Sequence, residues 1–473
     1  MVSIPSACLL SFVSVSVLGI HLSLPITASP SASRHARTNS DPFPFSPGFN
    51  IETVITLFEQ LPSHSWEFGT EAEALLEIYN PELSVFGEKL FPPPLPISVA
   101  LNVSLSLSSN LEEDVNSNGD ASQGVRALFY AQSKMQINLG PGPVNGSAFI
   151  DAGFAAADPS SLGVSAVLLG LSNLMYMKAA ELTMGYLTGT TPRSENGAIS
   201  HRADVAELWA DFLYMAPPFL AYYAIITSNT TLLQENVSQC SLYRDVLVTS
   251  PSNPSINPNL TSSKKSNIEG IWHHIVGPQS TDLSLWSTGN AWATGGIICV
   301  LATVIKAPSY LTLGWKDKAV SSLTGILKEI LDGAVLHQDI TVDPFNGLFR
   351  NYLDNKNGTA SPDPVESGHR FSEISSSAMI SAVIYRLAVL VPNLAYPSSP
   401  YIKFAETVCS LLGSGLNGQQ HIIVDGTATP TADPLCWQCT VPFTAGSPEG
   451  QSFVVAMYAA WRDCVKAGVC EHK

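Results

Sequence analysis

Apolar residues recur three and four positions apart through most of the chain after residue 160, which is the spacing of one face of an α-helix. Short loops rich in Gly, Pro and Asn separate these apolar stretches. The pattern therefore predicts a mostly helical protein. We expect helices over Leu162–Leu171, Tyr176–Leu187, Ala206–Thr227, Thr288–Ile305, Lys316–Leu331, Glu373–Leu390, Tyr401–Leu411 and Gly450–Val465.

Alternating apolar and polar residues are rare and lie in the N-terminal third. Ser98–Ser108 alternates, and Ala127–Ile137 reads in the same way, so we expect a few short strands there. From about residue 50 onward there is no linker, charge block or break in composition. We therefore expect one large, mostly α-helical domain over residues 49–473. A closed double ring of helical hairpins would bury every hairpin without end caps.

The first residues resemble an export signal. Cys8–Leu24 is an uncharged apolar run, followed by Pro25 and by the small residue Ala28. This predicts a secretory signal peptide over residues 1–28. An uncleaved membrane anchor is the alternative, although the run is short and is interrupted by Ser and His. Residues 29–48 are rich in Ser and Pro and read as a flexible leader. We predict no later membrane-spanning segment.

Glycosylation signals and cysteines fit an exported protein. Without the signal peptide, an odd number of cysteines remains, so at least one is unpaired. We expect Cys299 to be a buried free thiol and disulfides to form among the last five cysteines, Cys409, Cys436, Cys439, Cys464 and Cys470, because an oxidising compartment favours disulfides over metal. Asn-x-Ser/Thr sequons stand at Asn102, Asn145, Asn229, Asn236, Asn259 and Asn357.

Composition excludes several classes. The 473 residues are 45% hydrophobic and 13% charged, which is too apolar for a disordered chain. The net charge of −16, with no basic patch, makes a nucleic-acid partner unexpected. The sequence contains no GxSxG elbow, P-loop, HExxH or dinucleotide-binding glycine motif, and we expect no metal or cofactor.

One carboxylate lies in an apolar, aromatic segment. The stretch Trp209-Ala-Asp211-Phe-Leu-Tyr-Met215 surrounds Asp211 with large hydrophobic residues. A buried carboxyl group must be paired, hydrogen-bonded or protonated. Burial favours the protonated form that a general acid needs. Alternatively, Asp211 binds backbone amides at a helix start. The segment leaves both interpretations open.

Other candidate residues lie in turns before predicted helices. His201 follows a glycine turn upstream of Asp211. In Trp272-His273-His274 the neighbouring side chains diverge, so at most one histidine faces a site. Trp286 and Asn290 open an apolar helix, where a tryptophan suits stacking on a sugar ring or core packing. Asp158, followed by Pro159, reads most simply as a helix N-cap.

In order and spacing, these segments resemble glycoside hydrolase family 105, the unsaturated rhamnogalacturonyl hydrolases, and more distantly the unsaturated glucuronyl hydrolases. The strongest similarity is to the secreted fungal six-hairpin glycosidase-like proteins. The similar stretch runs from about Asp158 to Trp461. The matching segments are Asp158…Gly163, Thr191…His201, Trp209…Ala216, Gly270–His274, Trp286–Trp292, Glu373–Met379 and Glu449…Phe453.

The resemblance implies an (α/α)6 barrel of six helical hairpins and an unusual hydrolysis. Family members act on a sugar whose non-reducing end is a C4–C5 unsaturated uronate. Carried over by position, Asp211 is the acid and base and Asp158 a supporting carboxylate. The residues implied to contact the sugar are His201, Trp209, Met215, His274, Trp286 and Asn290. No metal is implied.

The sequence departs from the family at one informative place. Thr288 stands where we expect an arginine that would grip the uronate carboxylate. Arg202 is a possible substitute. Two other functions therefore stay open. An inverting glycosidase acting on a neutral oligosaccharide would pair Asp211 with Asp158 or Asp282. A non-catalytic, wall-associated glycan-binding protein would keep the aromatic residues without turnover.

Overall fold

In the computed structural model, the fold lies in one unit that runs from Pro42 to Lys473. The predicted signal peptide, most of the predicted leader, the predicted strand Ser98–Ser108 and the sequons at Asn102, Asn145, Asn259 and Asn357 lie outside the described residues. The structure describes residues 41–88, 91–93, 125–140, 147–151, 153, 155–249, 270–337, 347–353, 371–392, 399–414, 420–439 and 441–471.

Inner helices in the described part of the chain contact one another in a closed cycle. Each packs against the next, and the last returns to the first. These inner helices are α2 (Ser65–Tyr79), α4 (Gly163–Gly170), α7 (Pro217–Ile226), α10 (Ser287–Lys306), α14 (Ile374–Leu390) and α16 (Pro448–Lys466).

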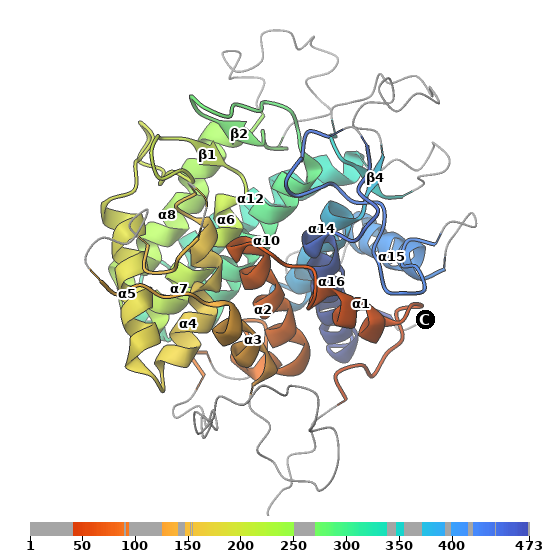
Figure 1. Cartoon of the computed structure of the whole chain (residues 1–473), viewed down its shortest axis with the longest axis horizontal. Helices are drawn as coiled ribbons and strands as arrows, with labels where there is room; N and C mark the ends of the chain where they lie inside the picture. Colours follow the sequence, from red (N-terminus) through yellow and green to blue (C-terminus); the bar gives the residue numbers. More distant parts are fainter. Residues whose placement is uncertain are drawn as a thin grey trace, which may run out of the picture. The chain divides into compact units, whose positions relative to one another are not determined.

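Outer helices alternate with the inner ones along the chain, and each packs on an inner neighbour (Figure 1). This alternation makes six helical hairpins and confirms the predicted (α/α)6 architecture. The outer helices are α1 (Ile51–Phe58), α3 (Arg126–Lys134), α5 (Leu174–Gly189), α8 (Thr230–Leu247), α12 (Lys316–Leu336) and α15 (Ser399–Ser414).

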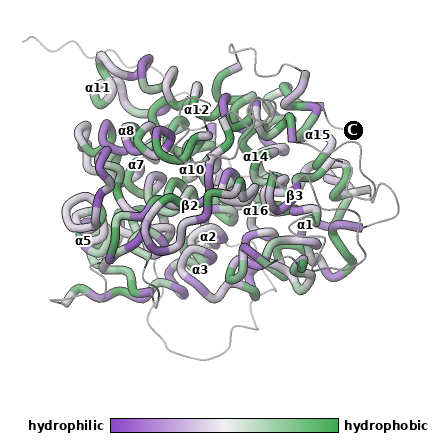
Figure 2. The backbone as a smooth tube through the Cα atoms, turned by 90° about the horizontal axis from the view of Figure 1, so that it is seen from above, coloured by the Kyte–Doolittle hydropathy of each residue, from purple (hydrophilic) through white to green (hydrophobic). Residues whose placement is uncertain are grey.

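The two sets of helices differ in their hydrophobic pattern. Inner helices are enclosed on all sides, and every residue of α14 from Ile374 to Ala388 is buried. Outer helices are amphipathic: α12 buries one stripe, which includes Leu323, Leu327 and Ile330, and exposes the rest. Figure 2 shows this alternation of hydrophobic and hydrophilic segments along α8 and α12. An all-apolar helix needs partners on every side, which an inner position supplies.

Because outer helices return the chain, all inner helices run in the same sense, and their N-terminal ends meet at one end of the ring. Two small sheets brace this end. Strand β1 (Leu208–Trp209) pairs antiparallel with β2 (Ile275–Val276), and β3 (Phe349–Arg350) with β4 (Ser372–Glu373). They fix the segments just before α7, α10 and α14. Short 3-10 turns, η1 (Pro81–Leu83) and η2 (Asp158–Leu162), and a short helix α11 (Ser309–Thr312) complete the described elements.

A short helix, α6 (Phe212–Met215), lies directly against α10. A Cβ atom added at Gly296 of α10 would stand 1.7 Å from the carbonyl oxygen of Leu213. Only glycine allows this approach, so the position of α6 depends on that residue.

Charged side chains close the ring where its last inner helix meets its first. Arg386 of α14 donates to Glu77 of α2 at 2.6 Å and to Asp463 of α16 at 2.5 Å. Arg462 of α16 donates to the backbone carbonyls of Glu77 and Ile78 at 2.7 and 2.9 Å. Arg462 thus satisfies carbonyl groups at the C-terminal end of α2, where the helix offers them no amide partner, while Arg386 pairs with carboxylates of α2 and α16.

Most predicted helices are confirmed, with boundaries within a few residues, except in two places. Ala206–Thr227 is not one kinked helix: β1, α6 and α7 divide it, and Pro217 and Pro218 open α7, where a missing N–H costs nothing. Ala127–Ile137 is not a strand, because most of it forms α3. The strands that do form, within the described residues, lie later, at the N-terminal ends of inner helices.

The prediction that no later segment could span a membrane needs correction. Among the described residues, α10 is long and apolar enough to do so by length and composition. However, 94% of its most apolar stretch is buried inside the ring, as in a core helix of a folded domain.

The cysteines form two short-range disulfides, Cys436–Cys439 and Cys464–Cys470, both among the five predicted to pair. Cys409 is buried, and Cys299 is free as predicted but only half-buried. Of the two described sequons, Asn229 is exposed, whereas Asn236 is buried and donates to the carbonyl of Pro217. Asn236 therefore cannot carry a glycan in the folded protein.

Candidate active site

The predicted catalytic residues lie at the N-terminal ends of the inner helices. Asp158 is the first residue of η2, just before α4, and Asp211 comes immediately before α6. Neither side chain caps its helix, so the interpretation of either residue as a helix cap is wrong. Both side chains keep some contact with solvent, with exposed fractions of 17% and 13%.

Asp211 is the open end of a row of buried polar groups. One of its carboxylate oxygens lies 3.2 Å from Nε2 of His274. On the far side of the ring, Nδ1 of His274 lies 3.2 Å from Oδ2 of Asp282, which also accepts a hydrogen bond of 2.8 Å from Tyr352. The neighbouring His273 points away, toward the carbonyl of Leu283. One histidine of the pair therefore serves the site, as predicted.

The two carboxylates determine the charge of His274. Burial alone would lower its pKa, but Asp211 and Asp282 outweigh burial and raise it. Burial would raise the pKa of Asp282, yet hydrogen bonds from His274, Tyr352 and the Ser284 amide, together with the charge of His274, lower it to about 2. An imidazolium between carboxylates is thus stabilised here, and it can exchange a proton with Asp211.

A second carboxyl–histidine pair lies beside the first. Nε2 of His201 lies 3.4 Å from Oδ1 of Asp158. Burial, with Asp151 and Asp211 as negative neighbours, raises the pKa of Asp158 well above its ordinary value, against the opposing effect of Arg202. Burial lowers the pKa of His201 to about 4. Burial therefore favours the protonated form of Asp158, next to a neutral imidazole.

Trp209 separates the two histidines. Its ring stacks on His201, with 4.9 Å between centroids, and meets His274 edge-on at 5.6 Å. Its indole N–H donates to Glu207 at 2.8 Å, and the other oxygen of Glu207 accepts from the backbone of Gln279 and Ser280. The ring is therefore held in one orientation while part of it stays exposed.

The remaining predicted residues are buried and pack behind the partly exposed side chains of the site. Trp286 is buried, packs on His274 at 4.4 Å and donates to Asn351 at 2.8 Å. Asn290 is buried, and its amide bonds the backbone of Trp272 and Trp286. Met215 is buried in α6. The structure thus brings Asp158, His201, Trp209, Asp211, His274 and Trp286 together and places Asn290 and Met215 in the surrounding packing.

Thr288 is also enclosed. Its hydroxyl donates to Glu373 at 3.1 Å, and Glu373 also accepts from the backbone amides of Ser375, Ser376 and Ala432. The carboxylate of Glu373 thus caps α14 and occupies the space where we expected a cation. The basic group that acts on the pKa of Asp158 is Arg202, which lowers it.

The site contains residues to which the sequence assigned no role. Glu449 accepts a hydrogen bond of 3.2 Å from Trp66, and burial, with Asp211, Glu67 and Glu373 nearby, raises its pKa well above the ordinary value. Trp437 lies 5.4 Å from Trp209. Glu449 opens a segment of the family pattern, which was the only available signal. Trp437 stands between two cysteines in a segment without helical periodicity, which carries no sequence signal of a site.

No metal site emerges from the part of the chain that the structure describes, since no three His, Cys, Asp or Glu side chains in it are arranged to share an ion. In the candidate site, His274 pairs with Asp211 and Asp282, and His201 pairs with Asp158.

Comparisons with known proteins agree with this geometry. The model of Glycosyl Hydrolase Family 88 matches residues 171–384, which include Trp209, Asp211, His274 and Trp286. No curated protein matches the sequence.

Among solved structures, a family 105 glycoside hydrolase of C. acetobutylicum is 13% identical with a TM-score of 0.56, over 87% of this chain and 98% of that one. A polysaccharide lyase is 14% identical with a TM-score of 0.53, over 88% and 96%. A possible family 105 member from Salmonella enterica is 17% identical with a TM-score of 0.46, over 64% and 71%. At these identities the structural similarity establishes the fold.

The match over residues 171–384 and the six-hairpin ring make the chain similar to the glycoside hydrolases of families 88 and 105.

Proposed function

We propose that the protein removes a C4–C5 unsaturated uronate from the non-reducing end of an oligosaccharide, with Asp211 as acid and base. The observation that carries the proposal is the contact between Asp211 and His274, which is backed by Asp282 and lies near the carboxyl group of Asp158. Such a site can deliver a proton to carbon and later recover one from water. The match to family 88 supports the substrate class.

The reaction begins with proton transfer from Asp211 to C4 of the double bond. Positive charge develops at C5, next to the ring oxygen, and water adds there while the carboxylate of Asp211 takes the water proton. The resulting hemiketal opens by breaking the bond between C5 and the ring oxygen. C1 then carries a hemiacetal, which releases the aglycone as an alcohol. Every proton that leaves Asp211 returns to it, so the enzyme is regenerated.

The other groups hold the ionisation states that this cycle needs. The imidazolium form of His274, which Asp282 favours, stabilises the carboxylate that Asp211 becomes once it has protonated C4. The protonated form of Asp158, which burial favours, donates a hydrogen bond to the substrate instead of adding a second negative charge. Arg202, which acts on the pKa of Asp158, is the cation that binds the uronate carboxylate.

An inverting glycosidase is the second candidate because Asp158, whose pKa is raised, lies near Asp211. Asp282 does not suit the second carboxylate of such an enzyme, because His274 and Tyr352 occupy its oxygen and separate it from Asp211.

The test uses unsaturated oligosaccharides made by lyases from pectin and glycosaminoglycans. The wild-type protein should abolish their ultraviolet absorbance, and Asp211→Asn should lower kcat by 100-fold or more. An Arg202→Gln variant should raise KM with little change in kcat. Release of sugar from neutral oligosaccharides without loss of absorbance would favour the inverting glycosidase. Binding without any turnover, equal in wild type and Asp211→Asn, would favour the glycan-binding protein.

We further propose that the protein is secreted and glycosylated, with residues 1–28 as the signal peptide. The apolar run Cys8–Leu24 and the exposed sequon at Asn229 support this. Expression in a eukaryotic host should yield protein that is secreted into the culture medium and begins near residue 29. Peptide mapping should find a glycan on Asn229 and none on Asn236. Retention inside the cell with an intact N-terminus would contradict secretion.

A further inference from the structure

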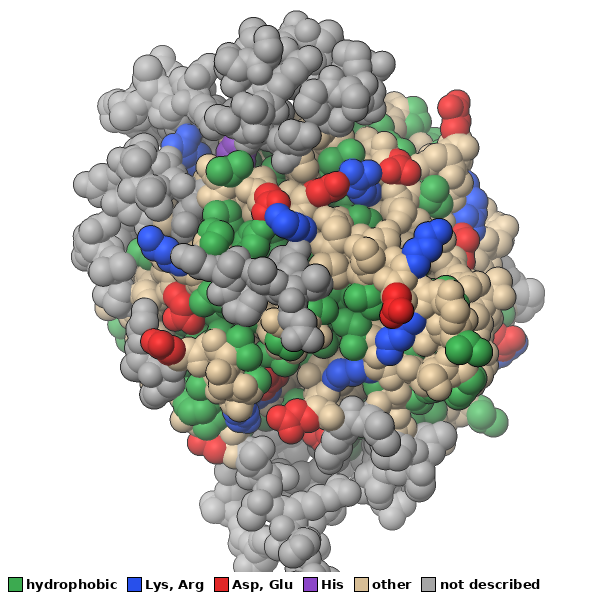
Figure 3. All heavy atoms as spheres, turned by 180° about the vertical axis from the view of Figure 1, so that it is seen from behind, with side chains coloured by type: hydrophobic (Ala, Val, Ile, Leu, Met, Phe, Trp, Pro, Cys, Tyr) green, Lys and Arg blue, Asp and Glu red, His purple; other side chains and the backbone are tan. Residues whose placement is uncertain are grey.

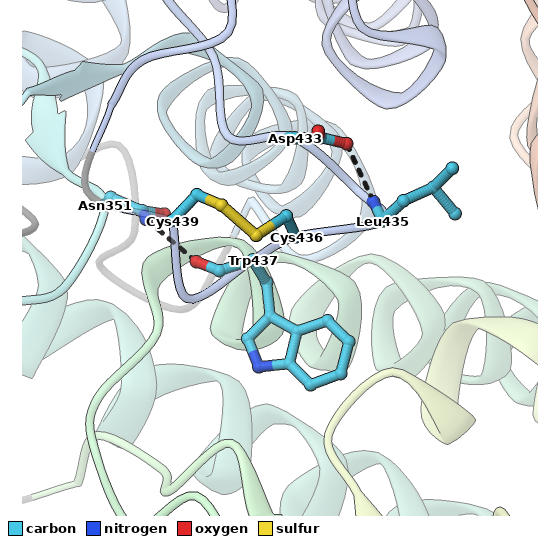
Figure 4. Close-up of a disulfide and its surroundings, with 6 residues drawn as sticks. All are labelled: Asn351, Asp433, Leu435, Cys436, Trp437 and Cys439. Carbon is cyan, nitrogen blue, oxygen red and sulfur yellow. Dashed lines mark hydrogen bonds between the residues drawn. A yellow bond between two sulfur atoms is a disulfide. The ribbon is translucent and has the colours of Figure 1, made fainter.

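A disulfide-closed turn brings Trp437 to the active site from a distant part of the chain. The turn lies between Thr431 and Phe443, whose backbones exchange hydrogen bonds of 3.1 and 2.9 Å. Cys436 and Cys439 are joined on either side of Trp437. Figure 4 shows the indole pointing away from the disulfide, toward ribbons of the middle of the chain.

Trp437 meets the same two rings that flank the catalytic carboxyls. Its centroid lies 5.4 Å from that of Trp209 and 5.5 Å from that of His274, with interplanar angles of 66° and 87°. Trp437 and Trp209 both remain half-buried, whereas His274 is fully covered. Solvent, and therefore a sugar, can reach the two indoles beside Asp211. Aromatic faces of this kind suit the apolar C–H face of a sugar ring.

The indole of Trp437 also has an unused donor. Its Nε1 is buried and has no hydrogen-bond partner among the described residues. A desolvated N–H without an acceptor is unfavourable. Trp272 and Trp292 share this feature, but both are completely buried in the core. At Trp437 a sugar hydroxyl or carboxylate could supply the acceptor.

Few contacts besides the disulfide hold the turn. Nδ2 of Asn351 donates to the carbonyl of Trp437 at 3.1 Å, while Oδ1 of the same amide accepts from Trp286. The amide of Cys439 donates to the carbonyl of Cys436 at 2.8 Å, and Asp433 caps the amide of Leu435 (Figure 4). The described part of this segment lies outside any helix, so helical hydrogen bonds do not hold it. The disulfide is the covalent cross-link that restrains it.

We infer that Trp437 is a sugar-contacting residue of the active site and that the Cys436–Cys439 disulfide positions it. Its ring packs on the substrate beside Asp211, and its indole N–H donates to an oxygen of the sugar. This inference rests on the proposed glycan substrate. It assigns Trp437 to substrate binding and not to proton transfer, so its loss should act on KM and not on kcat.

The experiment compares four variants in the absorbance assay. Trp437→Ala should raise KM about tenfold with kcat within about twofold, and Trp437→Phe, which keeps a ring but loses the N–H, should raise it about fivefold. The double variant Cys436→Ser/Cys439→Ser should raise KM in the same direction. Leu435→Ala is the matched control: this residue is in the same turn and 61% exposed, and its KM should not change.

Calorimetry in the Asp211→Asn background gives a readout that is independent of turnover. The lyase-generated unsaturated disaccharide should bind that protein. Adding Trp437→Ala should weaken binding and raise Kd about tenfold. An unchanged Kd overturns the inference even where the hydrolase activity is confirmed, and so does a fall in kcat at constant KM. Absence of any binding to the Asp211→Asn protein overturns both the inference and the proposed function.

Discussion

His274 connects two carboxylates of different character, because Asp211 faces solvent and Asp282 is locked behind it by Tyr352. Its pKa is raised by both neighbours. The ion pairs it makes therefore stabilise the fold fully below its unfolded pKa of about 6.5, and this contribution is lost as pH rises through the higher pKa of the folded state.

Replacing Asp282 should show this dependence directly. Asp282→Asn removes one negative neighbour, so the pKa of His274 falls toward its ordinary value. We expect the alkaline limb of kcat/KM to move to lower pH and kcat to fall about tenfold. The pH–rate profile measures it, with Tyr352→Phe as the milder control that keeps the carboxylate. A profile that keeps its alkaline limb in place would show that His274 does not control the reaction.

Asp158 offers a prediction in which stability and activity move in opposite directions. Its raised pKa means that folding costs free energy once pH exceeds the unfolded pKa of about 3.9, and the cost grows until the folded-state pKa is reached. Asp158→Asn, neutral at every pH, should therefore stabilise the protein by about 1–3 kcal/mol at pH 7 and have little effect near pH 3.5. Activity should fall by 100-fold or more.

Thermal unfolding at the two pH values, beside the activity assay, measures this. An Asp158→Asn protein that is less stable at pH 7 would show that the carboxyl group is ionised and paired in the native state.

At the residue scale the sequence predicted side chains that the fold brings together, but not the residues that lie behind them. Asp158, His201, Trp209, Asp211, His274 and Trp286 follow one another in a recognisable order, and the fold brings them together. The pairing of His274 with Asp282 depends on the hairpin that joins Ile275 to Asp282, and local patterns gave no sign of it. Trp437 and Glu449 come from distant segments that only the closed ring brings close.

Among the elements, α6 is the one whose placement decides the chemistry, since Asp211 precedes it. The pattern over 206–227 reads as a continuous helix, but the backbone amide of Ala210 donates to the carbonyl of His274 at 3.0 Å, and a helix cannot also make that bond. Tertiary pairing therefore overrides helical periodicity where the site is built. The sequence did not predict α2, because the buried positions of this helix include glutamates such as Glu71 and Glu77. These polar residues interrupt the apolar pattern that would indicate a helix.

Gly296 tests the dependence of the site on this packing. Gly296→Ala would place a methyl group 1.7 Å from the Leu213 carbonyl, so α6 must shift. We expect a loss of about 1–3 kcal/mol in unfolding free energy and at least a tenfold fall in kcat. Gly325→Ala is the control: it lies in exposed outer helix α12 with nothing within 4 Å, and should stabilise by about 0.5–1 kcal/mol. Equal effects of the two substitutions on activity would contradict the role of α6.

On the scale of the whole domain, stability depends on closing the ring. Arg386 joins α14, α2 and α16 in one buried network. Arg386→Leu leaves Glu77 and Asp463 buried without their shared cation, and should cost about 3–5 kcal/mol in unfolding free energy, measured in urea. Adding Glu77→Leu should recover part of that loss. If the double variant loses the full sum of both single effects, the residues act independently.

On the face shown in Figure 3, basic side chains are interspersed with acidic ones and do not gather into a patch. The helical architecture was predictable because inner and outer helices differ so clearly in hydrophobic pattern. The order of contacts around the ring was not predictable, because no local pattern in α2 or α16 indicates that the two helices are neighbours.

That neighbourhood has a consequence for biosynthesis. The seam between α14 and α2 is filled by α16, whose residues 448–466 leave the ribosome after all the other inner helices. Until then the nascent chain carries apolar helices with one flank uncovered, and the active site lacks Glu449. We expect ribosome-bound chains that end before residue 448 to remain protease-sensitive and to recruit chaperones, and protection to appear abruptly once α16 emerges.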